Sequence, residues 1–128
     1  MLGELEGYRD IVVFDMEAGV GTLLRMEKDD VDVVLVVANP SAKSIEAARR
    51  AAEIAAPIGR VIVIANRVRD DADLEAIRTA LPDHELVVVP EEPVIAGADR
   101  EGRAPIDVDE DAAGVVAVRE LAGRLAVG

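Results

Sequence analysis

The clearest structural pattern in the chain is VVLVVANPSAKSIEAARRAAEIAA, residues 33–56. It opens with an uninterrupted apolar run at residues 33–37, and such a run is typical of a parallel strand that is buried on both faces. A polar turn follows, and then a helical pattern over residues 44–56 in which apolar and charged side chains fall on different faces. Pro57 ends that pattern. The stretch is therefore one strand–turn–helix unit of an α/β protein.

The same alternation of strand and helix recurs along the chain. Further apolar runs occupy residues 11–14, 61–64 and 86–89, and helical patterns are expected at about 73–81 and from about 109 onward. Together they predict a three-layer α/β/α fold with a mostly parallel sheet, covered by helices on both faces. We expect residues 1–128 to form a single domain.

Two segments interrupt this alternation. Residues 19–26 make a poor helix because they carry two glycines, and a segment of low local stability is one that can move. Residues 90–108 are rich in proline and glycine, so they are expected to form a long loop. Loops of that length in a compact domain are usually functional or contact a partner.

The composition excludes several classes of protein and site. Hydrophobic residues make up 51% of the 128-residue chain, so disorder is not expected. The absence of cysteine excludes disulfides, thiolate metal sites and cysteine nucleophiles. A net charge of −12 disfavours direct binding to nucleic acid, because phosphates would be repelled. No apolar run approaches the ~18 residues of a membrane span and no leader pattern is visible, so we expect a cytoplasmic protein with no membrane partner.

The acidic excess has two interpretations. Only two of the 14 basic residues are lysine, and alanine and valine are abundant, which suggests a salt-adapted, halophilic protein. Salt would stabilise such a chain because it screens the repulsion between surface charges. The alternative is an ordinary acidic protein of the cytoplasm.

A short acidic motif follows the first apolar run. Asp15 stands at the carboxyl end of that run, where ligands bind in open α/β sheets, and Gly19 lies further along the same motif. In a nucleotide-binding protein such an Asp positions magnesium through water, and the glycine amide approaches a terminal phosphate. Alternatively, Asp15 caps the next turn and Gly19 supplies backbone freedom. The motif by itself leaves both interpretations open.

The ends of the next three runs carry polar turn residues. Asn39 follows the second run, Asn66 and Arg67 follow the third, and Pro90 and Glu91 follow the fourth. A side-chain amide presents a donor and an acceptor together, which suits the edge of a base such as adenine. The backbone beside Pro90 could lie against a planar base. Ordinary turn chemistry also explains both asparagines, and an acidic, proline-stiffened connector explains the last pair.

Together and in this order, these motifs resemble the MinD/ParA group of P-loop ATPases with the deviant Walker motif. The likeness is greatest to the ATPases that assist carbon monoxide dehydrogenase maturation. Phe-Asp-Met-Glu-Ala-Gly at 14–19 is similar to the Walker B and switch II stretch of that group, and residues 39–44 to its strand-to-helix turn. Residues 64–68 are similar to its base-recognition turn, and residues 89–91 to the backbone strip beside the adenine.

This resemblance spans about residues 8–127 and implies an incomplete P-loop NTPase-like (Rossmann-like) fold that binds ATP and Mg²⁺. Asp15 would organise magnesium and water, and Gly19 would sense the γ-phosphate. Asn66 would read adenine, with Arg67, Pro90 and Glu91 in the same cofactor-binding region.

Two departures from the family pattern limit what is implied. No Gly-x-x-x-x-Gly-Lys-[Ser/Thr] loop (Walker A) occurs in the sequence, and the strand before it and both family lysines are missing too. The cysteine pair that binds nickel in the maturation ATPases is also missing, so nickel delivery is not expected. The first hypothesis is therefore a nucleotide-binding domain of the ATPase family with at most weak ATP binding and negligible hydrolysis alone. The alternatives are a non-enzymatic regulatory or scaffolding module that keeps the fold for protein contacts, and a fragment of a full-length ATPase.

The missing strand has a structural consequence. In the family it lies between the strands that correspond here to residues 11–14 and 33–37. Either these two strands pair directly or another chain fills the gap, because unpaired strand edges invite association. We therefore expect a homodimer or a complex with a P-loop-bearing partner. A response-regulator-like domain is the rival fold: Asp15 would imitate its phosphoacceptor, but no lysine follows Lys43.

Overall fold

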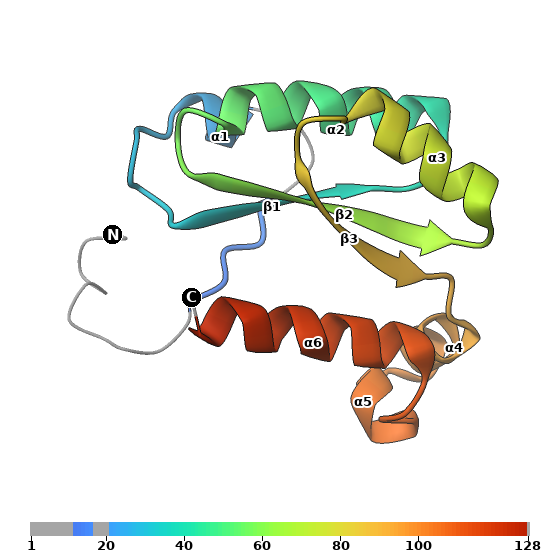
Figure 1. Cartoon of the computed structure of the whole chain (residues 1–128). Helices are drawn as coiled ribbons and strands as arrows, with labels where there is room; N and C mark the ends of the chain where they lie inside the picture. Colours follow the sequence, from blue (N-terminus) through green and yellow to red (C-terminus); the bar gives the residue numbers. More distant parts are fainter. Residues whose placement is uncertain (1–11, 17–20, 128) are drawn as a thin grey trace.

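The computed structural model describes residues 12–16 and 21–127, and in these residues one three-stranded sheet lies between layers of helices (Figure 1). The sheet has the order β1-β2-β3, and both strand pairs are parallel. The described elements, in chain order, are α1 (Gly21–Leu24), β1 (Val33–Ala38), α2 (Ala42–Ala55), β2 (Arg60–Val68), α3 (Asp71–Ala80), β3 (Glu85–Pro90), α4 (Pro93–Glu101), α5 (Pro105–Val108) and α6 (Ala113–Val127).

Helices cover the two faces of the sheet unequally. The helices α2 and α3 lie over one face, and α6 runs along the other (Figure 1). On the α2 side the core includes Val34, Val36 and Ala38 of β1, which pack with buried side chains of α2 and α3. On the α6 side Leu121 packs against apolar residues of β2 and β3. The predicted three-layer α/β/α fold with a parallel sheet is therefore confirmed.

Local chemistry sets the starts of the two helices on the first face. Ser41 is the N-cap of α2, and its hydroxyl accepts a hydrogen bond from the Ser44 amide at 3.2 Å. Asp70 caps α3 in the same way, through the Asp73 amide at 2.9 Å. Each cap satisfies one of the amides that a helix start leaves without an intrahelical partner. Both caps lie just beyond the carboxyl end of a strand, so they bring these turns to the same edge of the sheet.

The prediction of a strand at residues 11–14 is wrong for residues 12–14, which the structure describes. Residues 12–14 belong to no strand, and Val13 and Phe14 are 83% and 45% exposed; Ile11 lies outside the described residues. These residues do not pair with β1, so the alternative in which the two segments pair directly is wrong, and the alternative in which another chain fills the gap stays a prediction. The physical reason is that a lone strand with no neighbour gains no ladder hydrogen bonds.

The long loop expected at residues 90–108 is also wrong, because it contains α4 and α5. Pro93 and Pro105 each stand at the first turn of a helix, where the missing amide of proline costs nothing and its fixed φ angle favours the helix. Gly102 ends α4 with a φ of 69°, which glycine adopts without strain. The prolines and glycine therefore mark helix boundaries. The last helix begins at Ala113 rather than near residue 109.

Candidate functional site

The carboxyl ends of the three strands meet at one edge of the sheet, and an open cavity lies there. Its volume is about 270 Å³. In open parallel sheets this edge is where ligands bind, because the loops that leave the strands surround a crevice. The residues that line the cavity are Asn39, Pro40, Ser41, Arg67, Arg69 and Glu91.

A pair of side-chain amides joins the ends of β1 and β2. The Asn66 Nδ2 atom donates a hydrogen bond to Asn39 Oδ1 at 3.2 Å, and both residues are partly buried. The backbone amide of Asn39 donates to Ser44 Oγ at 2.9 Å, so the first turn of α2 fixes this end of β1. Within the described residues no hydrogen bond uses Asn39 Nδ2 or Asn66 Oδ1. The pair therefore retains one donor and one acceptor for a ligand.

Arg67 is held in an uncommon backbone conformation at the same edge. Its φ angle is 58°, in the left-handed region that residues other than glycine rarely adopt. The register between β2 and β3 shifts between Asn66 and Val68, so Arg67 lies at a β-bulge. A bulge turns the bulged side chain to a new direction. Here the Arg67 guanidinium lies 3.4 Å from a carboxylate oxygen of Glu91, which also lines the cavity.

The second arginine of the cavity is engaged by a carboxylate as well. Arg69 donates to Asp73 from its side chain at 3.0 Å and from its backbone amide at 3.0 Å. The side-chain hydrogen bond lowers the pKa of the Asp73 carboxyl, and the backbone hydrogen bond lowers it further. The same side-chain bond raises the pKa of Arg69. Both cavity arginines thus have carboxylate partners, and the cavity presents amides and paired charges.

The structure gathers four of the six predicted site residues at this edge. Arg67 and Glu91 line the cavity, Asn66 adjoins it through Asn39, and Pro90 ends β3 opposite Val68. The Glu91 amide donates to the Val68 carbonyl at 3.0 Å, which keeps β2 and β3 together up to the cavity.

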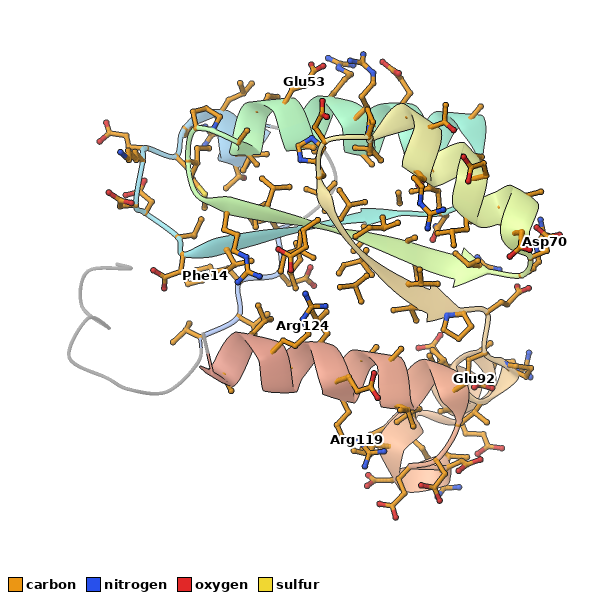
Figure 2. All side chains as sticks on the ribbon, viewed as in Figure 1. Phe14, Glu53, Asp70, Glu92, Arg119 and Arg124 are labelled. Atoms are coloured by element: carbon orange, nitrogen blue, oxygen red, sulfur yellow. The ribbon has the colours of Figure 1, made fainter. Side chains whose placement is uncertain are left out.

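The two remaining predicted residues are not placed at the cavity. Asp15 is exposed and is not among the lining residues, and Gly19 lies outside the described residues. Phe14, the neighbour of Asp15, lies far along the sheet from Asp70, which marks the carboxyl end of β2 (Figure 2). Among the residues that the structure describes, no group of three or more His, Cys, Asp or Glu side chains could hold a metal ion. The predicted magnesium role of Asp15 therefore remains a prediction.

Sequence reasoning missed Arg69 as a cavity residue. Its signal is its place just after the third apolar run, since residues that follow parallel strands gather at the carboxyl edge of the sheet. Ser41, the N-cap of α2, lines the cavity as well.

Comparison with known proteins gives this chain two relatives of similar sequence and a structural neighbour. No protein-family model matches the sequence. The chain is 34% identical over 109 residues to the uncharacterized ATP-binding protein MJ0823 of Methanocaldococcus jannaschii, a match that covers 81% of this chain and 42% of that protein. It is 30% identical over 121 residues to the ATP-binding protein MJ0547 of the same organism, covering 91% of this chain and 46% of that protein.

The structural neighbour is the MinD cell division protein of Aquifex aeolicus. The TM-score is 0.57 at 26% sequence identity, over 77% of this chain and 45% of the MinD chain. The chain is related to the MinD/ParA-type P-loop ATPases. It spans under half of the length of each of these three proteins, so more than half of each has no counterpart in the alignment. No helix in the described part of the chain is long and apolar enough to cross a membrane.

Proposed function

We propose that this chain is the base-binding part of a MinD/ParA-like nucleotide-binding domain and that it holds the adenine of ATP at the carboxyl edge of its sheet. The observation that carries the proposal is the amide pair of Asn39 and Asn66 beside the cavity. One free donor and one free acceptor on neighbouring amides match the edge of adenine, which offers an amino donor next to a ring-nitrogen acceptor. The names of the two relatives as ATP-binding proteins support the same ligand.

The surroundings of the amide pair fit a flat, neutral group. The Arg67 guanidinium is planar and 64% exposed at the cavity, so it can stack on a base. Glu91 forms an ion pair with that guanidinium. The unusual φ angle of Arg67 is explained if its side chain has to be presented to a ligand, because strained backbone is found at functional sites.

The same surroundings are poor for a triphosphate. The two arginines that line the cavity already bond to Glu91 and Asp73, and no Walker A loop is present in the sequence. Phosphate groups would therefore find few cationic or amide donors in this chain. We infer that the chain alone binds ATP weakly and hydrolyses it negligibly. Magnesium, where bound, would neutralise phosphate charge, and Asp15 is the residue proposed to hold it through water.

Titration calorimetry tests the proposal with adenosine, guanosine and ATP as ligands. Adenosine and ATP should bind with similar, weak affinity because the base supplies the contacts, and guanosine should not bind. Asn66→Ala should weaken adenosine binding by about tenfold, the equivalent of about 1.4 kcal/mol for a lost hydrogen bond. Thr79→Ala is the matched control, since Thr79 is exposed on α3 and lies outside the cavity.

Asp15→Ala separates the two predicted parts of the site. It should leave adenosine binding unchanged and reduce only the magnesium-dependent part of ATP binding. If Asn66→Ala and Thr79→Ala bind adenosine equally well, the amide pair does not read the base. If the unmodified chain gives no signal with adenosine or ATP, the scaffolding alternative replaces the proposal.

A further inference from the structure

Among the described residues that line the cavity at the carboxyl edge of the sheet, Glu91 is the one acid. Two arginines, Arg67 and Arg69, line the same cavity, and so does Ser41, the N-cap of α2. Guanidinium groups and the positive end of a helix dipole both attract phosphate groups. Whether the cavity attracts an anion therefore depends on the carboxylates that face these arginines.

The carboxylate that faces Arg69 is part of the fold. Asp73 accepts hydrogen bonds at 3.0 Å from both the backbone amide and the Nε atom of Arg69, and a third from Nη2 at 3.4 Å. The Asp73 side chain is only 12% exposed, lies in the first turn of α3 and does not line the cavity. Asp73 therefore fixes Arg69 to the start of α3 whether or not a ligand is bound.

The carboxylate that faces Arg67 makes a much weaker contact. One Glu91 oxygen lies 3.4 Å from Arg67 Nη2, longer than the about 2.7–2.9 Å of a strong hydrogen bond between charged groups. Within the described residues no other hydrogen bond uses the Glu91 carboxylate, and the side chain is 43% exposed. An ion pair as open as this contributes little to stability. The fold therefore does not depend on the Glu91 carboxylate.

The backbone, rather than the ion pair, keeps the Glu91 side chain at the cavity. The Glu91 amide donates to the carbonyl of Val68, the residue after Arg67, at 3.0 Å. The charge of Glu91 also reaches the second arginine: Asp73 is the main cause of the raised pKa of Arg69, and the Glu91 carboxylate raises that pKa further. One carboxylate thus offsets the positive charge of both cavity arginines.

The two arginines retain donors that an anion could use. Within the part of the chain that the structure describes, no hydrogen bond uses Arg67 Nε, Arg67 Nη1 or Arg69 Nη1. Phosphate oxygens form strong hydrogen bonds with such donors. The ionised Glu91 carboxylate has no donor of its own, so it repels a phosphate and offers it no hydrogen bond. A neutral base meets no such repulsion.

We propose that Glu91 is a specificity-determining residue that excludes anionic groups from the cavity, so that a nucleotide enters with its neutral base and keeps its phosphates outside. The proposal rests on the proposed function, because it sets the orientation of the ligand in the same cavity. The cavity volume of about 270 Å³ agrees with it. Pockets for drug-sized ligands measure about 300–1,000 Å³, so this cavity suits part of a nucleotide better than the whole.

Calorimetric titration of the full chain with inorganic phosphate at neutral pH tests the proposal. Glu91→Gln should bind phosphate about tenfold or more tightly than the unmodified chain, because glutamine has nearly the same size and carries no charge. The gained binding should weaken as KCl is added, since salt screens the attraction between an anion and arginine. Equal phosphate binding by the two proteins overturns the proposal.

Glu75→Gln is the matched control. Glu75 pairs with Arg78 on α3 at the same 3.4 Å, the Glu75 side chain is 66% exposed, and neither residue lines the cavity. The substitution changes the net charge by the same amount as Glu91→Gln, so phosphate binding should stay as in the unmodified chain. A gain equal to that of Glu91→Gln would show that only net charge matters, and it would overturn the proposal.

A second substitution locates the gained binding. Arg67→Ala in the Glu91→Gln background should remove it, because Arg67 supplies the donors that Glu91 no longer offsets. Arg78→Ala in the same background should leave the gained binding unchanged, since Arg78 does not line the cavity. Circular dichroism confirms that each variant folds. Phosphate binding that survives the loss of Arg67 would place the anion elsewhere and overturn the proposal.

Adenosine separates this proposal from the proposed function. Phosphate should compete with adenosine for Glu91→Gln and should not compete for the unmodified chain. If adenosine never binds but Glu91→Gln gains phosphate binding through Arg67, the proposed function fails while the role of Glu91 stands. If adenosine binds as expected and Glu91→Gln gains no phosphate binding, the proposed function stands and this proposal fails.

Discussion

Two glycines in α6 should respond in opposite ways to the same substitution. Helix propensity alone predicts that Gly→Ala stabilises at either site by up to about 1 kcal/mol. A Cβ atom at Gly123 would meet nothing within 4 Å, so Gly123→Ala should show this gain. A Cβ atom at Gly114 would lie 2.7 Å from Glu92 Cβ and 3.1 Å from Ile95 Cδ1. Figure 2 shows Glu92 at the start of α4, beside the first turn of α6.

The structure sets the size of the loss at Gly114. The Glu92 Cβ atom is fixed to the backbone, so the start of α4 has to move as a whole, and overpacking of this kind costs about 1–3 kcal/mol. The Gly114 amide also donates to Glu92 Oε1 at 3.0 Å, and displacement of Glu92 weakens a hydrogen bond worth about 1 kcal/mol. After subtraction of the propensity gain, Gly114→Ala should destabilise the protein by about 1–3 kcal/mol.

Urea unfolding followed by circular dichroism measures both variants against the unmodified chain. At this chain length 1 kcal/mol corresponds to a shift in Tm of about 4 °C, so thermal melts should separate the variants clearly. Equal stabilisation by Gly114→Ala and Gly123→Ala would refute the close approach of α4 and α6. Destabilisation by both would instead indicate that α6 tolerates no added methyl group.

Three other predictions follow from charge and backbone conformation. Arg67→Gly should raise the free energy of unfolding in urea by up to about 1 kcal/mol, because glycine adopts the φ of 58° without strain. The same variant should bind adenosine more weakly in calorimetry. A lower free energy of unfolding would refute the strain at Arg67. The pKa of Asp73 is lowered in the folded state by Arg69, so its stabilisation is complete above the ordinary pKa of 3.8 and is lost as pH falls through the lowered value. As the pH is lowered, the free energy of unfolding in urea should therefore fall less for Arg69→Ala than for the unmodified chain. An equal fall for both proteins would contradict the role of Arg69. If the net charge of −12 reflects adaptation to salt, Tm should rise from low to molar KCl, and a flat series removes the halophilic interpretation.

Regular elements with strong local patterns were predictable from sequence. The strands at β1, β2 and β3 and the helices α2 and α3 lie within a few residues of their expected positions. Each is defined by an apolar run or an amphipathic stripe together with a cap such as Asp70, and those signals depend only on neighbouring residues. The loop predicted at residues 90–108 was wrong because proline is common both in loops and in the first turn of a helix, where Pro93 and Pro105 lie.

The candidate site was partly predictable for a similar reason. Asn66, Arg67, Pro90 and Glu91 follow strands, and parallel strands bring such residues to one edge. The bond between the Asn66 and Asn39 amides and the bulge that turns Arg67 were not predictable, because both depend on the register between strands. Asp15 differs from these residues. The apolar run before it forms no strand in the described residues, so Asp15 does not lie with the other predicted site residues at the carboxyl edge of the sheet.

The fold class, the strand-ending turns and the absence of a Walker A loop could be read from the sequence, since these are properties of local pattern and composition. Three other features became visible only in the folded chain: which described strand lies at an edge of the sheet, which face of β1 stays exposed and why Gly114 has no room for a side chain. These features arise from the approach of segments distant in the chain, and an apolar strand such as Val33–Ala38 has the same sequence whether or not a neighbour covers it.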